Sequence, residues 1–228
     1  MIWDVGLGAA ANALAVLRAT REVPCAIRLI SFDSTLEPLE FALQNRESLG
    51  YFDGCEALVE SLAREHRVSF NRGPQNVQWE LRLSDFPALL AHSGAKHLPK
   101  PHLVMFDPCS PAKNPAMWTQ PVFVNLFGLL DSNRLCVLAS SSRSTLVRVT
   151  LLLAGFFVGV GHATGEKEET TLASNARGAL DELLNRDWLQ KAGRSSSAEP
   201  LALPVYRQAP LSPESWEKLQ SHPQFQGE

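Results

Sequence analysis

The chain has 228 residues, of which 45% are hydrophobic and 20% are charged, and its formal net charge is −3 with neutral histidines. This length suits one sizeable domain with a single core, and the composition excludes a disordered or fibrous chain. The acidic balance gives no global electrostatic reason to expect nucleic-acid binding, although it leaves a local basic face open.

The cysteines and the apolar runs indicate the cellular compartment of the protein. Four cysteines lie far apart in the chain: Cys25, Cys55, Cys109 and Cys136. No CxxC pair and no histidine at ligand spacing accompanies them, so we expect reduced thiols in a cytoplasmic protein and no metal site. No apolar run is long enough to span a membrane, and no basic region resembling a signal peptide starts the chain. Because residues 1–3 lead directly into a glycine loop, we expect a truncated or misassigned start.

Residues 2–17 combine a short apolar strand, a tight turn containing Gly6 and Gly8, and an alanine-rich helix. A turn of this kind after a first strand is where a Rossmann-type fold lets backbone N–H groups approach a nucleotide-like cofactor. The motif is weak by itself, because Ala10 stands where a third glycine is wanted and GxGxxG spacing is absent. An ordinary strand-to-helix turn is therefore an alternative interpretation.

The second predicted strand, residues 26–32, ends at Asp33, which lies 25 positions after Gly8. Folds of this type present an acidic residue about 20 positions after the glycine loop, where its carboxylate binds ribose hydroxyls. Glu37 and Glu40 are alternatives, but both lie beyond the strand on an expected helix. We interpret them as solvated helix charges.

Residues 36–72 read as mainly helical, with apolar spacing of three and four over 36–48 and 55–66. The third predicted strand, 77–83, alternates apolar and polar residues and is followed by Asp85. This carboxylate has two open interpretations: it accepts a hydrogen bond from an adenine amine, or it caps a helix over 86–92.

The fourth predicted strand, residues 103–106, leads into Asp107-Pro108-Cys109-Ser110-Pro111-Ala112-Lys113-Asn114-Pro115. A strand that ends in a carboxylate and a loop too rich in proline for regular structure is how open α/β sheets place chemistry at their carboxyl edge. We take this loop as the candidate active site.

The remaining elements complete a repeated strand–helix pattern. We expect helices over 116–130 and 145–153, strands over 135–140, 156–160 and 170–173, and a hairpin connection over 161–169. This order predicts an α/β fold with a mostly parallel sheet, helices on both faces and a terminal antiparallel hairpin. Beyond Asn175 we expect one more helix over 177–190 and then a Ser/Pro-rich extended tail with a short helix near 215–219. The predicted division is a domain over 1–175 and an extension over 176–228.

Three separated segments resemble the S-adenosylmethionine-dependent methyltransferases of the MnmC type, which modify the wobble uridine of certain tRNAs. Asp4-Val-Gly-Leu-Gly-Ala-Ala-Ala-Asn12 is similar to the family's acidic, glycine-rich cofactor loop. Asp107 to Trp118 resembles its signature of Asp, two variable positions, Ser or Ala, Pro-Ala-Lys-Asn-Pro and a following Met-Trp or Leu-Trp. Residues 139–148 and 154–156, with the 161–173 hairpin, resemble its remaining strands and Gly-x-Lys-rich turn.

The resemblance implies a Rossmann-like class I methyltransferase with a seven-stranded sheet and S-adenosyl-L-methionine as cofactor. It also implies methyl transfer to the exocyclic amine of 5-aminomethyl(-2-thio)uridine in tRNA. By matching position, Gly6 and Gly8 would line the methionine part of the cofactor, Asp33 would hold its ribose and Asp85 its adenine. The full implied cofactor-binding set is Asp4, Gly6, Gly8, Asn12, Asp33 and Asp85.

On the acceptor side, the resemblance implies that Asp107 faces the reactive centre. A carboxylate there binds an incoming ammonium and accepts or relays a proton. We expect Lys113 to contact tRNA phosphate, with a plain surface charge as the alternative. The implied substrate-binding set is Ser110, Lys113, Asn114 and Lys167, and neither a metal nor a membrane partner is expected.

Some features depart from the family pattern. Ala10 replaces a glycine of the cofactor loop, Cys109 stands where an aromatic residue is usual, and no second glycine-rich region indicates the family's fused flavin oxidase domain. Two alternatives therefore stay open: a methyltransferase with another nucleobase or a small amine as acceptor, and a degenerate, non-catalytic binding protein. An NAD-dependent dehydrogenase is disfavoured by the missing GxGxxG spacing.

Overall fold

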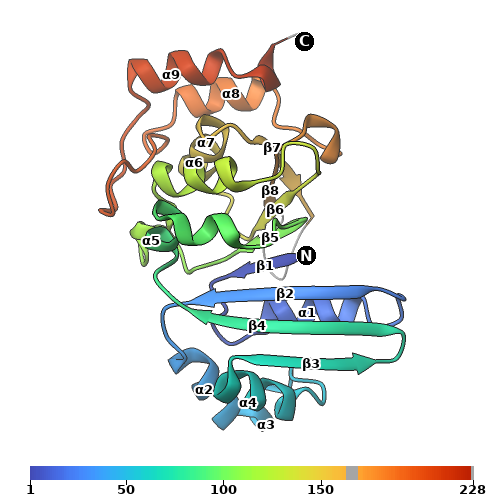
Figure 1. The fold of residues 1–228 in the computed structure, drawn as a ribbon. Helices are drawn as coiled ribbons and strands as arrows, with labels where there is room; N and C mark the ends of the chain where they lie inside the picture. The colour runs from blue at the N-terminus through green and yellow to red at the C-terminus, as the bar shows by residue number, and fades with distance from the viewer. Residues whose placement is uncertain (163–168, 227–228) are drawn as a thin grey trace.

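The computed structural model describes residues 1–162 and 169–226 (Figure 1). Within this part of the chain, eight strands form one sheet in the order β3-β4-β2-β1-β5-β6-β8-β7. The strands are β1 Ile2–Val5, β2 Ala26–Asp33, β3 Arg67–Arg72, β4 Gln75–Leu83, β5 Leu103–Phe106, β6 Val137–Ser140, β7 Phe157–Gly161 and β8 Thr170–Ser174. The α-helices are α1 Ala11–Ala19, α2 Glu37–Gln44, α3 Arg46–Leu49, α4 Glu56–Glu65, α5 Phe86–Ala91, α6 Gln120–Leu129, α7 Thr145–Leu153, α8 Arg186–Gly193 and α9 Pro213–Gln220.

Short 3-10 helices connect some of these elements: Ser93–His97, Pro115–Trp118, Arg177–Ala179 and Pro223–Phe225. The centre of the sheet is parallel, because β1 pairs with β2 and β5, β2 pairs with β4, and β5 pairs with β6 in the same direction. β8 is inserted antiparallel between β6 and β7. The predicted α/β class, the mostly parallel sheet and the terminal antiparallel hairpin are confirmed.

The predicted count of seven strands is wrong by one, because Arg67–Arg72 forms an edge strand antiparallel to β4. The apolar spacing before this segment predicts a mainly helical stretch through residue 72. α4 ends at Glu65, and His66 adopts a left-handed conformation that turns the chain back. From Arg67 onward, apolar Val68 and Phe70 alternate with polar residues, which is a strand pattern.

Helices cover the sheet from two sides, and each side has its own apolar cluster. Leu14 and Leu17 of α1 belong to one cluster, together with residues of α2, α4 and the β2–β4 half of the sheet. Leu146 of α7 belongs to the other, with residues of α5, α6 and the central strands. Neighbouring residues Leu29 and Ile30 of β2 are buried in different clusters, as alternation along a strand requires.

The C-terminal segment is part of this second cluster rather than an extended tail. α9 packs against α7 (Figure 1), and Leu219 and Phe225 are buried in the core. The Gln224 side chain accepts a hydrogen bond from Val158 N–H at 2.7 Å and donates to Val158 O at 2.8 Å, so it pairs with the edge strand β7. The helix predicted over 177–190 instead begins at Arg186. The domain boundary at residue 175 stays a prediction.

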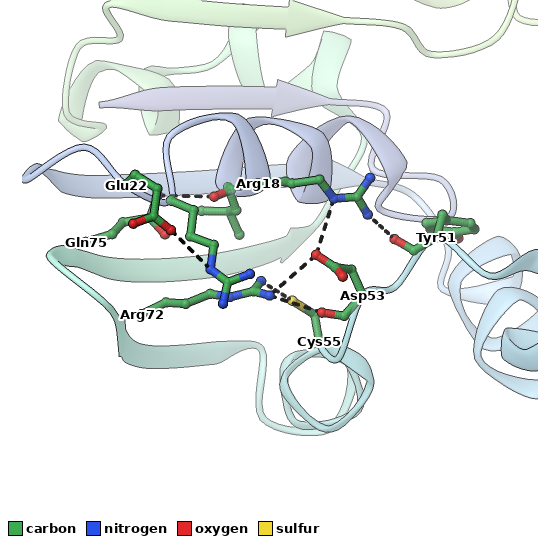
Figure 2. A network of polar contacts seen from close by, with 9 residues as sticks. Arg18, Glu22, Tyr51, Asp53, Cys55, Arg72 and Gln75 are labelled. Atoms are coloured by element: carbon green, nitrogen blue, oxygen red, sulfur yellow. Dashed lines mark hydrogen bonds and ion pairs between the residues drawn. The ribbon is translucent and has the colours of Figure 1, made fainter.

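Figure 2 shows the polar contacts that tie α1 to the loop after α3 and to β3. Arg18 donates to Tyr51 O at 2.8 Å and pairs with Asp53 at 3.4 Å, and Arg72 approaches the same Asp53 carboxylate at 3.5 Å. The Tyr51 hydroxyl donates to Ala9 O at 2.6 Å, directly at the glycine loop. Ion pairs this exposed contribute about 0–1 kcal/mol each, so the network mainly positions the loop.

No helix among residues 1–162 and 169–226 is both long and apolar enough to cross a membrane.

Candidate active site

A pocket of about 300 Å³ lies where the carboxyl ends of β1, β2, β4 and β5 meet. Parallel strands place their carboxyl ends on the same edge of a sheet, and a crevice opens at β1, where the strand order reverses because β2 lies on one side and β5 on the other. Residues from all four strand ends line the pocket, including Gly6, Gly8, Asp33, Ser84, Asp85, Asp107 and Asn114. All of these except Ser84 are site residues predicted from the sequence.

The glycine loop is fixed by the end of β2 and by the loop after β5. The N–H groups of Gly6 and Leu7 both donate to Phe32 O, at 2.9 and 3.2 Å. Gly6 has φ +86°, and a Cβ there would lie 2.7 Å from Pro108 Cα. The two loops therefore touch at a point where only glycine fits.

Ala10, the departure from the family's glycine pattern, is buried and has φ +62° at the start of α1. A left-handed conformation costs an ordinary L-residue roughly 1–2 kcal/mol. The position thus keeps the backbone geometry that glycine adopts freely. The substitution is compatible with a formed loop.

Asp33 closes the glycine loop from the end of β2. One of its carboxylate oxygens accepts from Gly8 N–H at 2.9 Å, and the other accepts from Ser34 N–H at 2.7 Å. The half-buried side chain lines the pocket, where it is the acidic group of β2 that a ribose would meet. Its ribose contact stays a prediction.

At the end of β4, the helix-cap interpretation of Asp85 is confirmed, and its adenine contact stays a prediction. Its Oδ1 accepts from Ala88 N–H at 2.9 Å and so caps α5. The residue also lines the pocket, and its second oxygen has no hydrogen-bond partner within the described residues. Ser84, which the sequence analysis missed, has a buried Oγ without a partner in that same part of the chain. Buried polar atoms rarely stay unpaired, so Ser84 indicates a ligand contact.

Asp107 is held by groups from two other segments. Ser141 N–H donates to its Oδ1 at 2.8 Å, Ser140 Oγ lies 3.4 Å from the same oxygen, and Asn12 Nδ2 lies 3.3 Å from Oδ2. Asn12 is absent from the pocket lining and contacts Asp107, so its cofactor contact stays a prediction. Sequence reasoning missed both serines; their only sequence signal is their place at the carboxyl end of β6, where Ser140 is the last strand residue and Ser141 follows it.

Asp4 is buried in β1, just before the glycine loop, and does not line the pocket, so its cofactor contact stays a prediction. Its Oδ2 accepts from Ser31 Oγ at 2.8 Å, and Ser31 Oγ accepts from Trp79 Nε1 at 2.9 Å. Burial raises the pKa of Asp4 to about 7; the Ser31 hydrogen bond lowers it, and the nearby charges of Asp33 and Asp107 raise it. A proton on Asp4 is therefore favoured by the fold.

This proton predicts a specific pH dependence of stability. The folded-state pKa of about 7 lies above the ordinary 3.8, so the stabilisation is fully present below about pH 4 and is lost as the pH rises through 7. This difference between the folded-state and ordinary pKa values of Asp4 corresponds to about 4 kcal/mol. We expect urea denaturation to give a lower free energy of unfolding at pH 8 than at pH 5, and Asp4→Asn to remove most of the difference. Parallel pH profiles for both proteins would contradict this.

The proline-rich loop separates this pocket from a second one of about 530 Å³, and Asp107 and Cys109 line both. Ser110 lines the second pocket and Asn114 the first, whereas Lys113 is exposed and lines neither. Lys167 lies outside the described residues. Among residues 1–162 and 169–226, no group of three or more His, Cys, Asp or Glu side chains could hold a metal ion.

Comparison with known proteins adds a family match. Residues 54–176 match the model of a family described as S-adenosyl-L-methionine-dependent methyltransferase. No curated protein matches the chain.

Solved structures match over nearly the whole chain. The crystal structure of MnmC2 from Aquifex aeolicus superposes with a TM-score of 0.60 and 24% identity, covering 97% of this chain and 66% of that one. A spermidine synthase bound to the transition-state analogue AdoDATO gives a TM-score of 0.48 and 12% identity, with coverages of 97% and 66%. Spermidine synthase from Thermotoga maritima gives 0.43 and 12%, with coverages of 96% and 67%. The chain thus spans just under two thirds of the first two structures.

Proposed function

Because the chain belongs to the S-adenosyl-L-methionine-dependent methyltransferases, we propose that it methylates the aminomethyl nitrogen of 5-aminomethyl(-2-thio)uridine at the tRNA wobble position. The observation that carries this proposal is the position of Asp107, which lies on the wall between two adjoining pockets. Two reactants that bind on either side of one carboxylate can meet there. The Pro-Ala-Lys-Asn-Pro signature and the similarity in fold to MnmC2 support the choice of acceptor.

The first pocket fits the cofactor by the chemistry of its lining. Asp33 and Asp85 are acceptors for ribose hydroxyls and an adenine amine, and Ser84 Oγ is a buried group that needs a partner. Gly6 and Gly8 leave the backbone open to the methionine part. The acidic side chains also suit a cofactor that carries a positive charge.

S-Adenosylmethionine supplies, when bound, an activated methyl group on a positively charged sulfur. Asp107 binds the incoming ammonium and accepts the proton that this nitrogen loses before its lone pair forms the new N–C bond. Ser141 N–H and Asn12 hold the carboxylate in place for that transfer. The chain's other contribution is to orient the two reactants, which supplies much of the rate enhancement in a displacement of this kind. A tRNA acceptor also places the proposed activity in the cytoplasm.

Calorimetric titration with S-adenosylmethionine tests the cofactor site independently of turnover. We expect the native protein to bind and Asp33→Ala to bind about 10- to 100-fold more weakly, because hydrogen bonds to a charged group contribute about 1.5–3 kcal/mol. Glu37→Ala is the matched control, since this carboxylate is exposed on α2 and does not line the pocket. Radiolabelled methyl transfer to tRNA that lacks the modification then tests the acceptor. Absence of binding by the native protein would overturn the cofactor site assigned to this chain.

A further inference from the structure

Residues 199–209, here called the C-terminal loop, connect α8 to α9 and project from the helical layer (the orange-red segment in Figure 1). Its two ends are joined, because the N–H groups of Ala198 and Glu199 donate to Ala209 O at 2.9 and 3.0 Å. The Glu199 carboxylate accepts from Ser212 N–H at 2.8 Å and from Ser215 Oγ at 2.9 Å. The base of the loop is therefore fixed.

The loop is also attached beside the proline-rich loop of the active site. Leu201 is buried and its carbonyl accepts from Gln120 N–H at 2.8 Å, one residue beyond its bridge to Thr119. Directly before this bridge, Trp118 Nε1 donates to Cys109 O at 3.2 Å. The C-terminal loop and the loop after Asp107 are thus anchored to one short stretch of chain.

The tip of the C-terminal loop exposes apolar side chains at this place. Leu203 is 70% exposed, Val205 65% and Tyr206 39%, so three large apolar residues within four positions face solvent. Of these, Tyr206 lines the second pocket, the one that shares Asp107 with the cofactor pocket. An aromatic side chain on a loop whose base is held beside the candidate active site provides a surface for stacking.

The second pocket is also lined by polar and cationic side chains. Ser141, Ser142 and Ser144 line it together with Arg143, which is exposed. Among residues 1–162 and 169–226, no carboxylate forms an ion pair with Arg143. An aromatic face, an arginine and several hydroxyls are the groups that bind a base, a phosphate and a ribose. The volume of about 530 Å³ lies within the range of about 300–1,000 Å³ for small-molecule sites.

We propose that the second pocket binds the acceptor nucleotide, with its base stacked on Tyr206 and its phosphate bound by Arg143. This inference rests on the proposed function and deepens it. It makes the C-terminal loop a substrate-recognition element and gives the exposed tyrosine a role. The base then lies in the pocket that Asp107 borders, so an amine attached to it reaches the carboxylate.

Two probes test the site: tRNA that lacks the modification, and uridine 5′-monophosphate, each titrated in the presence of S-adenosylhomocysteine. Tyr206→Ala is expected to weaken both about tenfold or more, since base stacking contributes about 1–3 kcal/mol. Tyr206→Phe keeps the ring and is expected to bind within twofold of the native protein. Arg143→Ala is expected to weaken both probes and to lower the salt dependence of tRNA binding.

Val205→Ala is the matched control, because this apolar residue is exposed on the same loop and does not line the pocket. Native-like binding of both probes by Tyr206→Ala would overturn the inference, as would equal losses in Tyr206→Ala and Val205→Ala. Self-association through the apolar tip, measured by sedimentation and abolished by Leu203→Ala, would also overturn it. The two proposals can also fail separately. If the native protein binds S-adenosylmethionine but methylates no tRNA, the proposed acceptor is overturned. If Tyr206→Ala still loses uridine monophosphate binding in that case, the nucleotide pocket remains supported.

Discussion

Replacing Asp107 with asparagine is expected to lower kcat for methyl transfer by about 10²–10⁴-fold, the usual contribution of a positioned general base. The affinity for S-adenosylmethionine should change by less than about threefold, because the proposed cofactor contacts are made by other side chains. Single-turnover methylation at several pH values separates a proton-transfer role from a structural one. As the pH rises and the free amine accumulates, the deficit of the variant should shrink.

The local contacts of Asp107 favour a folded variant. An asparagine oxygen can still accept from Ser141 N–H, and the amide of Asn12 can rotate to present its oxygen to the new NH₂ group. Loss of the Asp107 charge also removes one cause of the raised pKa of Asp4. Asp181→Asn is the control, because it makes the same carboxylate-to-carboxamide replacement at an exposed residue that lines neither pocket. A kcat within threefold of the native value would remove Asp107 from the reaction.

Gly6→Ala is expected to destabilise the protein by roughly 2–5 kcal/mol, from a strained backbone and from overpacking. The added Cβ would lie 2.7 Å from Pro108 Cα and 3.0 Å from Asp107 O, which are backbone atoms that cannot rotate away. Any relief must move the glycine loop or the loop that carries Asp107. We therefore expect weaker cofactor binding and a lower kcat together with a lower free energy of unfolding in urea.

Gly50→Ala separates the two causes of this loss. Gly50 also has a positive φ, +64°, but a Cβ there would have no atom within 4 Å. Its cost should be limited to the backbone term of about 1–2 kcal/mol, without any effect on the cofactor. If Gly6→Ala and Gly50→Ala lose equal stability and both keep full cofactor affinity, the contact between the two loops has no energetic role.

Much of the lining of the first pocket could be predicted from the sequence because its signals are local. Asp33, Asp85 and Asp107 each follow an apolar or alternating run, and the structure places all three at one pocket. A strand pattern needs only a few consecutive residues, and the shared direction of parallel strands then brings their ends to the same edge. The sequence therefore determined the fold class, the sheet edge that carries the site and the loop that carries Asp107.

Only the tertiary structure decided which distant groups meet. Asn12 reaches Asp107 across 95 residues and Ser141 reaches it across 34, and no spacing rule encodes either contact. The burial of Asp4, the edge strand β3 and the return of Tyr206 to the second pocket depend in the same way on how whole elements pack. The prediction of an extended C-terminal segment is wrong because its serines and prolines are a local signal for irregular structure. Its burial comes instead from a few apolar residues that contact a core formed elsewhere in the chain.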